Sequence, residues 1–118
     1  MTLTFTRLGE KLPAGVIEFV GNNQVKLNFS LLSNNPLTLD SSFVQVAVKL
    51  LQGLAELTDE INLERANHNP PLAPIEFASQ QLTGTPQQPI YQFVVQVAVN
   101  KGSFANNLVD PTQDALTT

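Results

Sequence analysis

Hydrophobic and polar residues alternate with a helical period over one long stretch, from Ser42 to Ala66. The apolar residues recur at steps of three and four and form one broad stripe: Phe43, Ala47, Leu50, Leu54, Leu57 and Ile61. The polar residues follow the same steps and form a second stripe: Gln45, Lys49, Gln52, Glu56 and Asp59. Two such stripes at a period of about 3.6 residues predict an amphipathic helix over about 42–66 with one buried face.

Two interpretations are open for the first part of this stretch. The tetrapeptide Gln45–Val48 recurs as Gln96–Val99, so a duplicated unit would make 43–48 a strand and begin the helix near Lys49. A tetrapeptide is compatible with either state, and we favour the longer helix. In that helix Val46 faces outward, whereas in a strand it would face inward.

Period-two alternation of apolar residues predicts the strands. The segments that carry it, or that are extended beside proline, are Thr2–Leu8, Val16–Val20, Gln24–Leu32, Ile75–Ala78 and Ile90–Asn100. Gly21–Asn23 predicts a hairpin loop, because Gly and Asn tolerate positive φ. The Gln-, Thr- and Pro-rich stretch from Ser79 to Pro89 predicts a loop.

Together these elements predict an α+β fold. We expect an antiparallel sheet of about five strands, with one long amphipathic helix (about 42–66) packed on one face and 90–100 as a central strand. Residues 1–104 would form a single α+β domain, and the polar residues 105–118 a frayed C-terminal tail.

The scarcity of charge changes the functional picture. Only 14% of the residues are charged, against about 25% in a typical globular protein, and the net charge is −4. Protein interfaces are depleted in Lys, Glu and Asp, so part of this surface is expected to contact a partner. The six basic residues are scattered singly along the sequence, which argues against nucleic-acid binding.

Several classes of chemistry have no support in the sequence. The chain contains no cysteine, which excludes disulfides and Cys-based zinc sites. No apolar run approaches the roughly 20 residues of a membrane helix, and the N-terminus lacks the pattern of a secretory signal. We therefore expect a cytoplasmic protein that contacts no membrane and needs no cofactor.

A weak metal site is the alternative at the end of the predicted helix. Glu60, Glu64 and His68 follow one another at steps of four, so they share one face, and carboxylate and imidazole groups bind divalent metals. The spacing differs from the zinc motif His-Glu-x-x-His, and a solvated acidic helix end explains the same residues. No Gly-x-Ser-x-Gly elbow is present, so we assign no catalytic residue and expect no enzymatic activity.

The helix also carries candidate interface residues: Val46, Leu63, Glu56 and Glu60. Val46 and Leu63 are apolar residues on its outward side. Glu56 and Glu60 repel one another one turn apart, and near the C-terminal end of a helix cations are preferred. Arg65, on the same helix, could offset this repulsion. So could a basic residue from the predicted sheet, from a second subunit or from a partner protein.

The expected function is that of a non-enzymatic small globular subunit acting through protein–protein interaction or homo-oligomer assembly. Its partner would be itself or another protein. The alternative is a small-ligand-binding domain with a pocket between helix and sheet, lined by Leu54, Leu57, Phe77, Tyr91 and Phe93. A third possibility is an enzyme that uses Glu64, His68 or a glutamate whose side chain faces inward.

Overall fold

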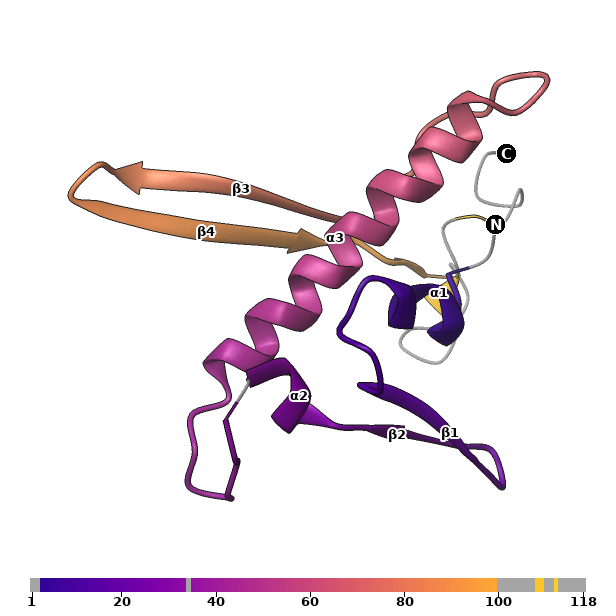
Figure 1. Cartoon of the computed structure of the whole chain (residues 1–118). Coiled ribbons are helices and arrows are strands. Elements are labelled where there is room, and N and C mark those ends of the chain that lie inside the picture. The colour runs from indigo at the N-terminus through magenta and orange to yellow at the C-terminus, as the bar shows by residue number, and fades with distance from the viewer. Residues whose placement is uncertain (1–2, 34, 100–107, 110–111, 113–118) are drawn as a thin grey trace.

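The computed structural model of the chain describes residues 3–33, 35–99, 108–109 and 112. Its helices are α1 (Phe5–Glu10), α2 (Phe29–Ser33) and α3 (Val44–Ala66). Its strands are β1 (Ile17–Gly21), β2 (Gln24–Leu27), β3 (Ala78–Thr85), β4 (Gln88–Val95), β5 (Ala98–Val99) and β6 (Leu108–Val109). Figure 1 shows α3 as a long rod beside which the other elements are arranged. The expected α+β class with one long helix and antiparallel strands is confirmed.

The single sheet of about five strands is wrong. The described strands form three separate antiparallel pairs, β1–β2, β3–β4 and β5–β6. The predicted central strand 90–100 is divided between β4, which ends at Val95 and pairs with β3, and β5, which pairs with β6, while Asn100 lies outside the described residues. The hairpins β1–β2 and β3–β4 form from strands that are close in sequence, and they lie apart in space (Figure 1). Local pairing therefore replaces the long-range pairing that a continuous sheet requires.

The predicted strand at Thr2–Leu8 is also wrong, because Phe5–Glu10 is helical. Thr4 caps this helix, with its Oγ1 accepting a hydrogen bond from the backbone N–H of Arg7 at 3.2 Å. Leu8 and Leu12, one turn apart, pack into the hydrophobic core. Gly53 of α3 lets α1 come close, since a Cβ there would lie 2.8 Å from Leu12 Cδ2. Packing against α3 thus overrides the period-two pattern.

The hairpin β1–β2 confirms the strand predicted at 16–20, and its loop contains Asn22 and Asn23 with positive φ of 53° and 61°. The long strand predicted at Gln24–Leu32 is wrong in its second half, where α2 forms. The helical turn buries Leu32, which a strand would have placed on the solvated face.

Helix α3 confirms the favoured interpretation and rules out a strand over 43–48, since helical structure begins at Val44. The expectation that Val46 faces outward is wrong, because its side chain is only 6% exposed and packs with Leu32. Phe43, the first residue of the predicted apolar stripe, is 76% exposed. Helix α2 packs on the side of α3 that carries Val46. At its N-terminal end, α3 therefore buries Val46 in place of the Phe43 side chain that the predicted stripe contains.

The chain from Ile75 to Pro89 differs most from the prediction. Ile75–Phe77 lie outside any strand, and Ala78 begins β3. The expected loop at Ser79–Pro89 is instead most of the hairpin β3–β4, which turns at Pro86 and Gln87. Of the predicted tail 105–118, β6 and Thr112 are described, and the rest lies outside the described residues.

Two small hydrophobic clusters lie along α3. The first contains Leu12, Val16, Leu32 and Val46, and the second contains Leu57, Ile61 and Ile75. The Cα radius of gyration is 16.5 Å, whereas a compact chain of this length has about 13.5 Å. Large apolar side chains of the described residues are exposed, Phe19, Leu39 and Leu82 among them. The molecule is therefore open, with apolar area left outside the core.

Candidate functional site

The hairpin β3–β4, which we call the arm (Ala78–Val95), stands away from α3 and ends far from the other labelled elements (Figure 1). Directly opposed residues of an antiparallel pair point to the same face. The observed register therefore gives the arm one mostly apolar face, made by Ala78, Gln80, Leu82, Gly84, Pro89, Tyr91, Phe93 and Val95. The other face is mostly polar and contains Ser79, Gln81, Thr83, Thr85, Gln88, Ile90, Gln92 and Val94.

The apolar face of the arm is largely uncovered. Leu82 is 64% exposed, Tyr91 61% and Val95 44%. The rings of Tyr91 and Phe93 stack on this face, with centroids 6.4 Å apart and an interplanar angle of 26°. Clustered exposed apolar side chains mark interaction surfaces more often than single ones do. The sequence prediction missed Leu82 because it assigned the surrounding residues to a loop.

The arm carries no charge. None of the eighteen residues from Ala78 to Val95 is Asp, Glu, Lys, Arg or His. Lysines and other charges on an open strand normally oppose pairing with another chain. The arm therefore combines an open apolar face with the absence of the residues that prevent association.

The base of the arm is fixed to α3 by hydrogen bonds. Thr58 Oγ1 accepts from the backbone N–H of Ala78 at 3.3 Å and donates to Leu54 O at 2.8 Å. The Asn62 amide donates to Ile75 O at 3.0 Å and accepts from Ile75 N–H at 2.7 Å. Phe77 O also accepts from the backbone N–H of Gln96 at 2.8 Å. These bonds set the position of an arm that receives little packing along its length.

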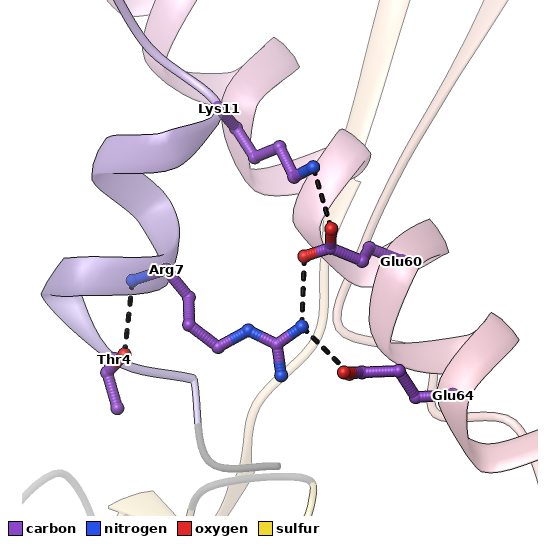
Figure 2. Close-up of polar contacts among 5 residues, drawn as sticks. All are labelled: Thr4, Arg7, Lys11, Glu60 and Glu64. Atoms are coloured by element: carbon purple, nitrogen blue, oxygen red, sulfur yellow. Dashed lines mark hydrogen bonds and ion pairs between the residues drawn. The ribbon is translucent and has the colours of Figure 1, made fainter. Parts of the chain in front are cut away.

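A cluster of ion pairs joins α1 to α3 (Figure 2). Arg7 Nη2 lies 2.9 Å from Glu60 Oε2 and 2.8 Å from Glu64 Oε2. Lys11 Nζ lies 2.9 Å from Glu60 Oε1. Arg7 of α1 and Lys11, the residue that directly follows α1, offset the acidic end of α3, so a basic residue from a sheet or a partner is not needed for this. The sequence prediction named neither residue as a partner of these acids, because it placed Arg7 in a strand and Lys11 in a turn.

The cluster shifts the pKa of three groups. Hydrogen bonds from Lys11 and then Arg7 lower the pKa of the Glu60 carboxyl. The hydrogen bond to Glu60 raises the pKa of the Lys11 ammonium, and those to Glu64 and Glu60 raise the pKa of the Arg7 guanidinium. Each shift stabilises the charged form of its group, as expected for an ion-paired contact between elements. Arg65 has a different role, since it is buried and its Nε donates to Ala73 O at 2.6 Å.

The four candidate interface residues have different surroundings. Leu63 is 65% exposed and Glu56 is exposed, as their positions on α3 suggested. Val46 is buried, and Glu60 is paired with Arg7 and Lys11. The structure therefore does not join these four into one open patch.

The candidate pocket residues divide into two groups. Leu54, Leu57 and Phe77 line a hollow of about 130 Å³ beside α1, which is small compared with the 300–1000 Å³ of typical ligand sites. Tyr91 and Phe93 lie on the arm and do not line it. A larger groove of about 790 Å³ lies elsewhere, lined by residues that include Leu27, Phe29, Leu37, Leu39, Phe43 and Val46. Sequence reasoning missed this groove because it treated 24–32 as one strand.

The residues of the metal alternative have other partners, and Glu60 pairs with Arg7 and Lys11. Glu64 pairs with Arg7, and the His68 ring Nδ1 lies 2.9 Å from Pro70 O. Within the described residues, no group of three His, Asp or Glu side chains is placed to hold a metal ion. Among the described helices, none has the length and apolar character needed to cross a membrane.

Comparison of the chain with models of protein families, with curated proteins and with solved structures finds no match.

Proposed function

We propose that the protein is a non-enzymatic subunit that acts by assembling with other protein chains through its β3–β4 arm. The observation that carries this proposal is the open apolar face of the arm, with Leu82, Tyr91 and Val95 exposed on a hairpin free of charge. Burying such a face against another chain removes apolar surface from water and stabilises the complex.

The amount of open surface supports the same function. Large hydrophobic side chains are exposed along the arm, namely Leu82, Ile90, Tyr91, Val94 and Val95. The arm extends away from α3 (Figure 1), so another chain can reach these side chains.

Sedimentation velocity from micromolar to near-millimolar protein tests this function. We expect the wild-type chain to sediment as a species heavier than its monomer mass of 12.8 kDa. The double variant Tyr91→Lys/Val95→Lys places charge on the apolar face, whose desolvation costs free energy, and should sediment as a monomer. Circular dichroism checks that both proteins retain the same helical content.

The matched control places the same two charges on the opposite face. Gln81→Lys/Gln88→Lys alters exposed residues of the polar face and should associate like the wild type. Wild-type protein that remains monomeric at every concentration would contradict self-association. Equal effects of the two double variants would show that the apolar face is not the contact.

A further inference from the structure

Each strand of the arm has an unpaired row of backbone groups along its outer edge. The hydrogen bond from Gln96 N to Phe77 O shows that these two residues form a hydrogen-bonded pair. In an antiparallel ladder such pairs alternate with pairs whose N–H and C=O groups point outward. In the observed register, the outward groups on β4 are those of Tyr91, Phe93 and Val95, together with the C=O of Pro89.

The two edges of the arm are not equivalent. On β3, the outward N–H of Ala78 already donates to Thr58 of α3, so this edge is partly occupied at its base. The outward row of β3 continues through Gln80 and Leu82 to Gly84, whose φ of 86° departs from strand geometry. On β4, the row from Tyr91 to Val95 is uninterrupted, and Pro89 near the tip lacks an N–H.

We infer that β4 pairs edge to edge with β4 of a second copy of this chain, about a two-fold axis at Phe93. This inference rests on the proposed function and specifies its partner and its mode. Phe93 then lies opposite Phe93 of the other copy, and Tyr91 of each copy lies opposite Val95 of the other. The five-residue ladder 91–95 leaves Pro89 outside, so its missing N–H costs no hydrogen bond.

The chemistry of β4 favours a second copy as the occupant. Aromatic pairs and pairs of an aromatic with a β-branched residue stabilise adjacent antiparallel strands, and this register forms three of them on one face. Each chain carries a net charge of −4, but the arm has no charged residue, so two copies meet where like-charge repulsion is weakest. A two-fold interface also requires a self-complementary surface, and the Tyr91–Val95 row satisfies this requirement.

The pairing also gives the arm structural support. A two-stranded hairpin by itself is at best marginally stable in water, and three or more strands with an apolar face are needed for independent stability. Two arms joined at β4 form a four-stranded antiparallel sheet with one continuous apolar face. The dimer thus supplies strand neighbours that the hairpin lacks among the described residues.

Two proline variants of the full-length chain test the edge. Leu82 and Tyr91 are directly opposed, both are exposed, and both direct their N–H outward. Tyr91→Pro and Leu82→Pro therefore remove the same kinds of group, one from the β4 edge and one from the β3 edge. We expect Tyr91→Pro to weaken dimerisation by roughly tenfold or more, because each dimer loses two ladder bonds, whereas Leu82→Pro, which keeps every ladder bond of the β4 edge, weakens it much less.

Amide hydrogen exchange on the wild-type protein provides a measurement without any substitution. Under edge pairing, the N–H groups of Tyr91, Phe93 and Val95 gain protection as the protein concentration rises. Those of Gln80 and Leu82 do not, since they lie on the other edge. Circular dichroism of both proline variants verifies that α3 is intact.

The outcomes separate this inference from the proposed function. Association that survives Tyr91→Pro, or is lost equally with Leu82→Pro, overturns the β4 pairing while leaving assembly through the arm in place. Concentration-dependent protection on β3 in place of β4 does the same. A wild-type chain that never exceeds the mass of a monomer overturns the inference, and it contradicts self-association as well.

Discussion

At the scale of single residues, polar side chains determine where segments of the chain attach to α3. Asn62 satisfies both backbone groups of Ile75, and Thr58 holds the first residue of β3. Arg65, buried near the end of α3, donates to Ala73 O. These contacts join residues 8 to 20 positions apart, so sequence periodicity gives no sign of them.

Asn62→Ala should destabilise the protein by about 1–3 kcal/mol, because Ile75 is buried and its N–H and C=O would lose their partner. The midpoint of urea unfolding, followed by circular dichroism, measures this change. Gln45→Ala, an exposed substitution on the same helix, should have little effect. Equal midpoints for the two variants would show that the Asn62–Ile75 bonds contribute nothing to stability.

At the scale of elements, α1 is held on α3 both by apolar packing and by ion pairs. Leu8 packs against both hydrophobic clusters, while Arg7 and Lys11 contact the acidic residues of α3. The side chains in the ion pairs are partly exposed, so solvent and salt weaken them. The packing therefore provides most of the attachment, and the charges specify its position.

Glu60→Gln should lower the thermal unfolding midpoint at low salt, since two ion pairs lose their charge. The difference from wild type should vanish near 1 M salt, where the Debye length is about 3 Å. Because the pKa of Glu60 is lowered in the folded state, its contribution is present above the ordinary Glu pKa of about 4.3 and is lost as pH falls through the folded value.

At high pH the contribution of Lys11 to stability changes with pH in the opposite direction. Its pKa is raised, so its contribution is present below the ordinary Lys pKa of about 10.4 and is lost as pH rises through the folded value. Calorimetry across this range checks both limits. A destabilisation by Glu60→Gln that is independent of salt and pH would contradict an electrostatic role.

At the scale of the whole molecule, the chain buries little of its apolar surface by itself. The long helix carries two small clusters, and the arm and the hairpin β1–β2 extend away from them (Figure 1). Phe19 and Leu39 are further large apolar side chains left exposed. Such an open arrangement is typical of subunits that complete their cores in an assembly.

Small-angle X-ray scattering of the variant Tyr91→Lys/Val95→Lys, which we expect to be monomeric, tests the open shape. We expect a radius of gyration near the 16.5 Å of the Cα atoms, well above the approximately 13.5 Å of a compact chain. A value at the compact limit would show that the arm folds back onto α3 in solution. The control variant Gln81→Lys/Gln88→Lys should give the larger radius of an oligomer.

The sequence alone determined α3, the hairpin loop at Asn22 and Asn23, and a strand in the segment that begins at Ile90. These features follow from local periodicity and from the φ preferences of single residues. A further local signal was available at 78–95, where a two-residue turn at Pro86 and Gln87 separates β-branched and aromatic residues. Because the polar face of this hairpin is rich in Gln and Thr, the sequence prediction assigned 79–89 to a loop.

Tertiary structure alone decided α1 and α2, the burial of Val46, and the separation of the strands into pairs. Leu8 and Leu32 reach the core only as parts of helices, and Leu12 reaches it just after α1 ends. The energy of burying these residues against α3 outweighs a short period-two pattern. The same packing covers one side of α3 and leaves the apolar face of the arm largely uncovered. The open face and the open edge of the arm are therefore properties of the three-dimensional arrangement, because alternation in sequence does not show which face is covered.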